Sequence, residues 1–175
     1  PPRTLLLDVA GPIEVLRRAN LIQERLNFSV RYVSASRSLR TSIGLSIAGI
    51  EPLPQSLPDD AMIVLAGNVD TLIDGSGAAP HDEPQERKIV GWLRARIRPG
   101  HRLVMICSGS VLAARAGLLD GYACTTHHLN CEQLAALAPQ AKVFDNRLFV
   151  DDRDRLSSAG ITAGIDLMLH VVAQM

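Results

Sequence analysis

The sequence has little of several features that mark specialised classes of protein. Its three cysteines, Cys107, Cys124 and Cys131, show no CxxC spacing, which argues against a disulfide framework or a structural zinc site and favours a reducing compartment. It has no apolar run of the ~18 residues that a membrane-spanning helix needs, and no signal-peptide pattern at its start. We therefore expect a soluble cytoplasmic protein with no metal site and no membrane contact.

The sequence also lacks an excess of charge of either sign. Eighteen Lys and Arg residues oppose eighteen Asp and Glu residues. A protein that binds nucleic acid or an anionic membrane surface carries an excess of basic residues, so these residues have no such footprint. The length of 175 residues and a hydrophobic content of 47% suffice for one well-buried domain. Any contact with DNA is expected to reside in a domain outside this chain.

Apolar, β-branched stretches alternate with helical patterns along the chain. Strands are predicted at 28–36, 61–67 and 102–107, with a short strand or hairpin at 43–53. Helices are predicted at 11–26, 82–97, 130–139 and 162–174, and the stretch 142–160 reads as a two-stranded excursion. This alternation is typical of a parallel sheet with helices on both faces. The sequence therefore predicts an α/β fold with a mostly parallel central sheet.

Cys107 stands where the predicted strand 102–107 passes directly into the helical pattern "SGSVLAARAGL". A corner of this kind presents a nucleophile on a tight turn, and it needs a small residue such as Gly109 because neighbouring backbone comes close. The N-terminus of the following helix would lower the pKa of the thiol. The alternative is a buried, inert thiol, since free cysteine is among the most buried residue types.

Three motifs resemble a known family. "DVAGPIEVL", "ICSGSVLAARAGLLDGYACTTHH" and "LSSAGITAGIDLMLHVV" resemble the ThiJ/PfpI superfamily, the class I glutamine amidotransferase-like domains, in that family's order and spacing. The resemblance covers nearly all of residues 1–175 and implies a flavodoxin-like three-layer sandwich with a nucleophile-elbow cysteine. It also implies that the family's first strand precedes Pro1 and is missing from this numbering.

The resemblance gives candidate catalytic roles to Cys107, Asp8 and His127. It implies that the Asp8 carboxyl points at the cysteine, although an aspartate ahead of "GP" is also a common turn or capping residue. Two neighbouring anions repel, so one partner must hold the proton, and a protonated Asp8 that donates to a thiolate meets this condition. His127 matches a histidine that lies beyond the elbow in many relatives.

The candidate ligand-binding residues surround the same corner. In relatives, paired glycines direct backbone N–H groups at the elbow, and Gly67 and Asn68 would do so here, with the N–H of Ser108 completing an oxyanion-hole-like nest. A glycine turn that merely ends a strand explains the same residues. The ligand-binding candidates are Gly67, Asn68, Ser108, Gly109, Thr126 and Ile161. Gly164, by contrast, is expected to let the last helix approach the sheet.

Two subgroups of the superfamily share this pocket. One is the N-terminal domain of AraC-type transcriptional regulators, which "HHLNCEQLAALAPQAKVFDNRLFVDD" most resembles. The other is the isocyanide hydratase-like enzymes, in which Cys107 would attack the isocyanide carbon and Asp8 would relay the proton. His128 replaces a tryptophan common in the hydratases, and Ser108 replaces the histidine of the protease-like members, which argues against a peptidase.

The sequence favours the regulator interpretation, with a cysteine-based redox sensor as a third alternative. The chain begins at "PPRTLLLD" and ends at "VVAQM", as an excised domain would. We expect a homodimer that binds a small metabolite around Cys107, uses no cofactor, has little or no turnover, and contacts DNA only through a helix-turn-helix domain beyond Met175.

Overall fold

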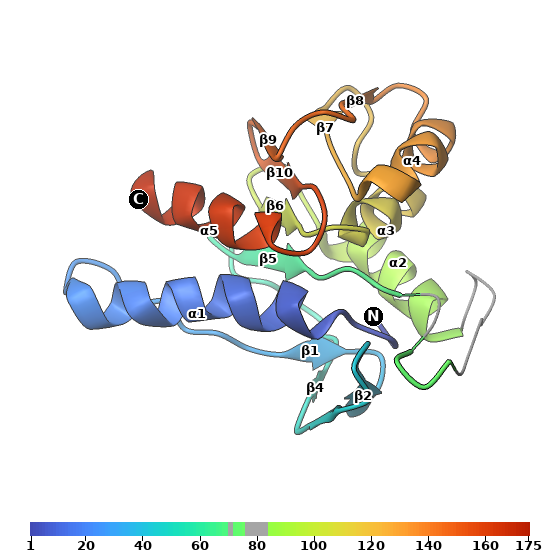
Figure 1. Ribbon diagram of the computed structural model, residues 1–175. Coiled ribbons are helices and arrows are strands. Elements are labelled where there is room, and N and C mark those ends of the chain that lie inside the picture. The colour runs from blue at the N-terminus through green and yellow to red at the C-terminus, as the bar shows by residue number, and fades with distance from the viewer. Residues whose placement is uncertain (70–71, 76–83) are drawn as a thin grey trace.

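The structure, a computed structural model, describes residues 1–69, 72–75 and 84–175 (Figure 1). The first two residues of the predicted helix 82–97 lie outside this set. A four-stranded sheet forms the centre, in the order β5-β6-β10-β9. Its strands are β5 (Met62–Leu65), β6 (Arg102–Met105), β10 (Arg155–Ser158) and β9 (Phe149–Asp152). The first three run parallel and β9 runs antiparallel at one edge, so the predicted mostly parallel sheet is confirmed.

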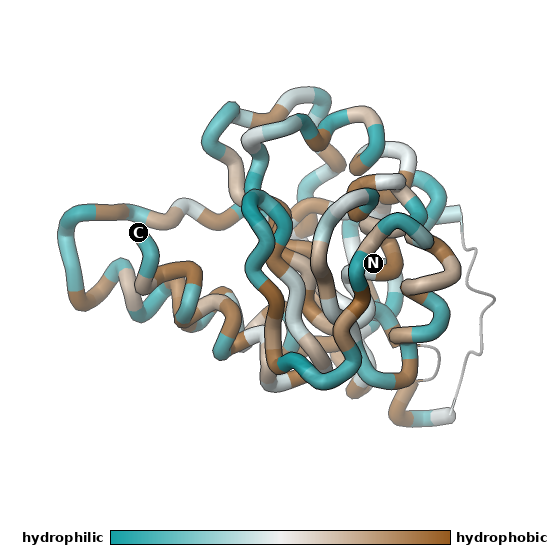
Figure 2. The backbone as a smooth tube through the Cα atoms, turned by 90° about the horizontal axis from the view of Figure 1, so that it is seen from above, coloured by the Kyte–Doolittle hydropathy of each residue, from teal (hydrophilic) through white to brown (hydrophobic). Residues whose placement is uncertain are grey.

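Helices cover both faces of this sheet. They are α1 (Leu6–Ile22), α2 (Pro84–Arg96), α3 (Gly109–Arg115), α4 (Cys131–Leu137) and α5 (Ala163–Ala173). Leu103 and Met105 of β6 pack with α2, α3 and α4 in one hydrophobic cluster. Val104 and Ile106 point the other way and pack with α1 and α5 in a second cluster. The hydrophobic stretches accordingly lie toward the middle of the molecule (Figure 2).

The side-chain alternation along β6 therefore builds a three-layer α/β arrangement, because successive residues of a strand face opposite sides of the sheet. Among the helices of the described ranges, none has the length and apolar character to cross a membrane.

The predicted strand 28–36 does not join the central sheet. Only β1 (Val33–Ser34) forms there, and it pairs in parallel with β4 (Glu51–Pro52) in a separate two-stranded sheet. Pro52 stands opposite Ser34 and has no N–H to donate, which limits the ladder at that position. The hairpin expected at 43–53 is instead made by β2 (Ser38–Arg40) and β3 (Ser46–Ala48).

The stretch 142–160 is not an excursion, because β10 lies inside the central sheet between β6 and β9. All four residues of β10 are buried, as expected of a strand covered on both faces. The preceding residues form β8 (Lys142–Val143), which pairs with β7 (Ala123–Cys124).

The first helix begins at Leu6, five residues before the predicted start. Pro12 therefore lies inside α1, where its missing N–H leaves the carbonyl of Asp8 without its helical partner. This early start has a consequence for the site, because it puts Asp8 in the first turn of a helix rather than at the end of a strand.

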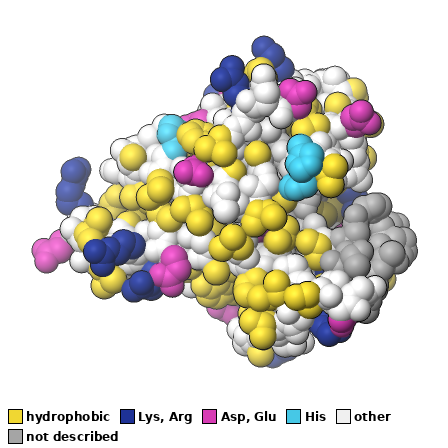
Figure 3. Space-filling model, viewed as in Figure 1, with side chains coloured by type: hydrophobic (Ala, Val, Ile, Leu, Met, Phe, Trp, Pro, Cys, Tyr) yellow, Lys and Arg dark blue, Asp and Glu magenta, His cyan; other side chains and the backbone are white. Residues whose placement is uncertain are grey.

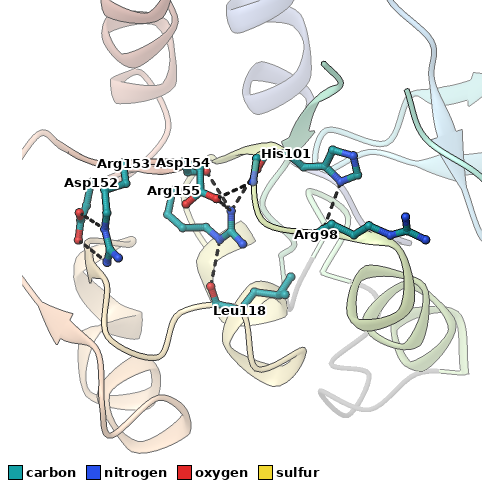
Figure 4. A network of polar contacts seen from close by, with 8 residues as sticks. Arg98, His101, Leu118, Asp152, Arg153, Asp154 and Arg155 are labelled. Atoms are coloured by element: carbon teal, nitrogen blue, oxygen red, sulfur yellow. Dashed lines mark hydrogen bonds and ion pairs between the residues drawn. The ribbon is translucent and has the colours of Figure 1, made fainter. Parts of the chain in front are cut away.

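A buried arginine holds together the edge of the sheet where β6 and β10 begin (Figure 4). The guanidinium of Arg155 donates to the carbonyl oxygens of Leu118, His101 and Asp154, each at 3.1 Å, and pairs with the Asp154 carboxylate at 3.1 Å. Its planar fork of donors suits several acceptors at once. Cys107 and its neighbours lie at the opposite end of these strands, where β5 and β6 end.

Gly109 is required where α3 meets β5. A Cβ atom at this position would lie 2.2 Å from the carbonyl oxygen of Leu65, a backbone atom that cannot move aside freely. Gly109→Ala should therefore lower the free energy of unfolding by about 2 to 4 kcal/mol, measured by urea denaturation.

A matched control is the exposed Gly91 of α2, where a Cβ would meet nothing within 4 Å. Gly91→Ala should raise the free energy of unfolding by about 0.5 to 1 kcal/mol, because alanine favours the helix. Equal effects of the two substitutions would contradict the close approach at Gly109.

Candidate functional site

Cys107 occupies the turn between β6 and α3 in a strained backbone conformation. Its φ angle is +55°, a left-handed value that costs a non-glycine residue about 1 to 3 kcal/mol and needs support from its surroundings. The hydroxyl of Thr126 gives part of that support by donating to the carbonyl oxygen of Cys107 at 2.9 Å. The N–H of Ile106 donates to the carbonyl oxygen of Leu65 at 2.9 Å, which ties the turn to β5. The cysteine side chain is buried.

The Asp8 carboxyl lies beside this cysteine, fully buried at the start of α1. Its Oδ2 atom accepts a hydrogen bond from the N–H of Gly67 at 3.0 Å, whereas Oδ1 has no hydrogen-bond partner among the described residues. Burial raises the pKa of Asp8 to about 7, against the opposing effects of the Gly67 N–H and the Cys107 thiol. Asp8 is therefore the group of this pair that titrates near neutral pH.

The thiol of Cys107 does not have the lowered pKa that the sequence predicts. Burial and the charge of Asp8 raise the pKa of Cys107 to about 11, although the N–H groups of Ile161 and Ser108 and the Ser108 hydroxyl act in the opposite direction. The expected effect of the helix N-terminus is outweighed by the cost of an anion in a buried place. The proton consequently stays on sulfur, which reverses the predicted pair of a protonated Asp8 and a thiolate.

Gly67 and Asn68 follow β5 and face the turn, but their backbone N–H groups are already engaged. The Gly67 N–H bonds to Asp8, and the Asn68 N–H donates to the Ser108 hydroxyl oxygen at 2.9 Å. That hydroxyl in turn donates to the carbonyl oxygen of Asn68 at 2.9 Å. Two of the three predicted N–H donors, those of Gly67 and Asn68, are therefore engaged by side chains, whereas the Ser108 N–H acts on the Cys107 sulfur.

Ile161 and His127 border the cysteine from the far side. The N–H of Ile161 faces the Cys107 sulfur from a backbone with a φ of +29°. The His127 ring packs on Gly160, where a Cβ would lie 2.7 Å from Cδ2 of the ring. Burial and the neighbouring His128 lower the pKa of His127. No hydrogen bond or ion pair joins His127 to Cys107 within the described part of the chain, so the histidine flanks the site without completing a catalytic pair.

Sequence reasoning missed a polar network behind Asn68. The side-chain oxygen of Asn68 accepts from the N–H of Arg3 at 3.1 Å, and its amide nitrogen donates to Glu86. Glu86, which is only 3% exposed, forms an ion pair with Arg115 of α3 at 3.0 Å. A glutamate in the first turn of a helix is usually a solvated residue that favours the helix dipole, so nothing in its sequence context pointed to burial.

The residues before α1 lead directly into the site. Thr4 forms an antiparallel bridge with Asn68, and the N–H of Leu5 donates to the carbonyl oxygen of Gly67 at 3.2 Å. Across residues 1–69, 72–75 and 84–175, no cluster of three or more His, Cys, Asp or Glu side chains is arranged to hold a metal ion.

Comparisons with known proteins agree with this arrangement. Residues 4–174 match the model of the DJ-1/PfpI family. The chain is 37% identical over 175 residues to the HTH-type transcriptional regulator GbdR of Pseudomonas aeruginosa, a match that covers 97% of this chain and 43% of that protein. The chain thus spans less than half the length of this curated relative. It is also 25% identical over 177 residues to an isonitrile hydratase of Pseudomonas putida, covering 99% of this chain and 68% of that protein.

Among solved structures, the fold resembles that of an AraC family transcriptional regulator from Pseudomonas putida, with a TM-score of 0.76 and 24% identity. The match covers 98% of this chain and 86% of that one. At this identity the likeness concerns the fold alone.

Asp8 should make the stability of the protein depend on pH. Because its folded pKa of about 7 lies above the ordinary 3.8, its contribution to the free energy of unfolding falls as pH rises from about 4 to 7. Asp8→Asn should remove this pH dependence. Its free energy of unfolding, relative to that of the wild type, should therefore rise by up to about 4 kcal/mol between pH 4 and pH 7, measured by denaturation at each pH. The exposed Asp60 provides a control, and Asp60→Asn should leave the wild-type profile unchanged. Parallel profiles for Asp8→Asn and wild type would contradict the buried carboxyl.

Alkylation should report directly on the Cys107 thiol. With a pKa of about 11, only about one molecule in a thousand carries the thiolate at pH 8, so iodoacetamide should label Cys107 slowly, with a rate that still climbs at pH 10. Asp8→Asn removes a neighbouring negative charge and should speed the labelling. Peptide mass spectrometry separates Cys107 from Cys131, the half-buried cysteine that serves as internal reference. A labelling rate that levels off below pH 9 would show an activated thiol instead.

Proposed function

This chain belongs to the DJ-1/PfpI family, and within that family we propose that it is the effector-sensing domain of an AraC-type transcriptional regulator. The proposal draws on the likeness to GbdR along 97% of the chain. It also draws on a balanced net charge, which suits a domain that leaves contact with DNA to another part of a longer protein. Fold membership alone would not carry it, because this fold hosts many functions.

The likeness to GbdR along 97% of the chain is the observation that carries the proposal, and the burial of the Cys107 thiol supports it. A nucleophilic cysteine works as a thiolate, yet burial holds this thiol protonated up to a pKa of about 11. Two of the donors that would stabilise an oxyanion, the N–H groups of Gly67 and Asn68, are engaged by Asp8 and Ser108. A nucleophile elbow that keeps its shape but holds a neutral thiol is suited to recognition rather than turnover.

We propose that the effector binds around this elbow. Oδ1 of Asp8 is buried without a hydrogen-bond partner among the described residues, and an effector that opens the turn would supply an N–H or O–H group to it. Gly67, Asn68, Ser108, Gly109, Thr126 and Ile161 would form the walls and His127 the rim. Binding would then shift the balance between two arrangements of the regulator, since an effector acts only through its different affinities for two states. A domain of this kind acts in the cytoplasm, where its DNA lies.

Exposed hydrophobic side chains on α1 and α5 suit a dimer. Leu21 and Ile22 of α1 are 63% and 68% exposed, and Leu169 of α5 is 54% exposed. In Figure 3 a band of hydrophobic side chains crosses this face of the molecule over the two helices. We include a homodimer in the proposal, with this band as part of its interface.

The alternative is an isocyanide hydratase-like enzyme, favoured by the 25% identity to an isonitrile hydratase and by the contact of Asp8 with Cys107. In that reaction the Cys107 sulfur would add to the terminal isocyanide carbon, and that same carbon would take up a proton relayed by Asp8 to give a thioimidate, R–N=CH–S–Cys107. Water would then displace the sulfur, so that R–NC and H2O yield R–NH–CHO and the free thiol. The step requires the thiolate that burial disfavours here.

Turnover assays separate the two functions. The purified protein, incubated with an aryl isocyanide at pH 7, should form the N-formamide at the background rate, and Cys107→Ala should give the same rate. Liquid chromatography of the formamide provides the measurement. Robust turnover that disappears in both Cys107→Ala and Asp8→Asn would support the hydratase function and contradict the sensor function.

A further inference from the structure

A second pocket lies away from Cys107, where β1 and β4 end. It has a volume of about 280 Å³ and lies between the loop after β1, the residues after β4 and the first turns of α2. Its lining comprises Ser34, Ala35, Ser36, Arg37, Pro52, Leu53 and Lys88. None of these residues belongs to the site around Cys107, so the pocket is separate from the proposed effector site.

The two charged residues that line this pocket, Arg37 and Lys88, are both cationic. Arg37 and Lys88 are exposed at its rim, and neither side chain has an ion-pair or hydrogen-bond partner in the part of the chain that the structure describes. The lining contains no carboxylate. Two cations that converge on one concavity without a counter-charge attract a small anion, most strongly where solvent is partly excluded.

Ser34 adds an unpartnered polar group to the same pocket. It is only 4% exposed, and its hydroxyl has no hydrogen-bond partner among the described residues. A buried hydroxyl without a partner costs the folded state free energy that a bound acceptor would recover. The apolar part of the lining comes from Ala35, Pro52 and Leu53, and both Ala35 and Leu53 also pack against the core cluster below.

The walls of the pocket are held in place by contacts outside it. Pro52 pairs with Ser34 between β4 and β1, and the indole N–H of Trp92, one turn after Lys88 on α2, donates to the carbonyl oxygen of Pro54 at 2.7 Å. The backbone that carries the cations, the hydroxyl and the apolar wall is therefore held by contacts between three different parts of the fold. Such preorganisation lowers the entropic cost of binding.

We propose that this pocket binds a small organic carboxylate with a short apolar body. The carboxylate would lie between Arg37 and Lys88 and accept from the Ser34 hydroxyl, while the apolar body would lie against Pro52 and Leu53. The apolar wall distinguishes this ligand class from inorganic phosphate, which has nothing to place there. The inference does not depend on the function assigned to Cys107.

Titration of the isotope-labelled protein with butyrate at constant ionic strength, followed by NMR, tests the proposal. Butyrate should cause saturable shifts of the backbone amides of Ser34–Arg37, whereas butyramide, which has the same shape without the charge, should cause none. Phosphate should bind about tenfold more weakly than butyrate, since it loses the apolar contact. Shifts that do not saturate, or phosphate binding as tight as butyrate, would overturn the proposal.

Variants locate the binding on this pocket. The double change Arg37→Gln/Lys88→Gln should weaken butyrate by about tenfold or more. A matched control, Arg18→Gln/Arg25→Gln, removes the same charge from exposed residues that do not line the pocket and should bind as wild type. Equal binding by both double variants would overturn the proposal.

Ser34→Ala should change stability and butyrate affinity in opposite directions, which a purely structural role of the hydroxyl would not predict. Without ligand it should melt at or above the wild-type temperature, because it removes an unpartnered hydroxyl, yet it should bind butyrate about threefold more weakly. Wild-type affinity in Ser34→Ala would exclude the hydroxyl from the site and overturn that part of the inference.

Discussion

The close approach of two backbones is the constraint on which the site depends. The first turn of α3 lies against the end of β5 with no room for a side chain between Gly109 and the carbonyl oxygen of Leu65. Cys107, two residues earlier, has a left-handed conformation, and the Thr126 hydroxyl donates to its carbonyl oxygen. The same approach brings Gly67 beside Cys107, so that a Cβ on Gly67 would touch Asp8 and Cys107 together. The backbone packing at this end of the strands therefore determines how close Asp8 and Cys107 lie.

Burial then raises the pKa values of both Asp8 and Cys107. A thiol and a carboxyl in water would ionise in the order of their ordinary pKa values, and this order survives in the pocket although both pKa values rise. Asp8 becomes sensitive to pH near neutrality, while the cysteine stays neutral. A ligand that donates to Oδ1 of Asp8 would favour the carboxylate, and one that brings a negative charge would favour the acid.

The sequence predicted what depends on local pattern. The apolar run Leu103–Ile106 predicted a buried strand, and the small residues after Cys107 predicted a tight corner with Gly109 behind it. It failed where tertiary packing overrides local pattern. The place of β10 inside the sheet was missed because β9 and β10 are adjacent in sequence and read as a peripheral hairpin. The helical start at Leu6 was missed because Gly11 and Pro12 resemble a helix boundary. The link from Asn68 to Glu86 joins residues far apart in sequence, and no local pattern records it.

The two ends of the central strands have different roles, one in holding the fold and one in forming the candidate site. The buried guanidinium of Arg155 ties three loops together where β6 and β10 begin, and Cys107 lies where β6 ends, about 13 Å away for a strand of four residues. Substitutions around Cys107 can therefore accumulate without loosening the anchor at the other edge. The framework and the candidate site are therefore held by different residues at opposite ends of the same strands.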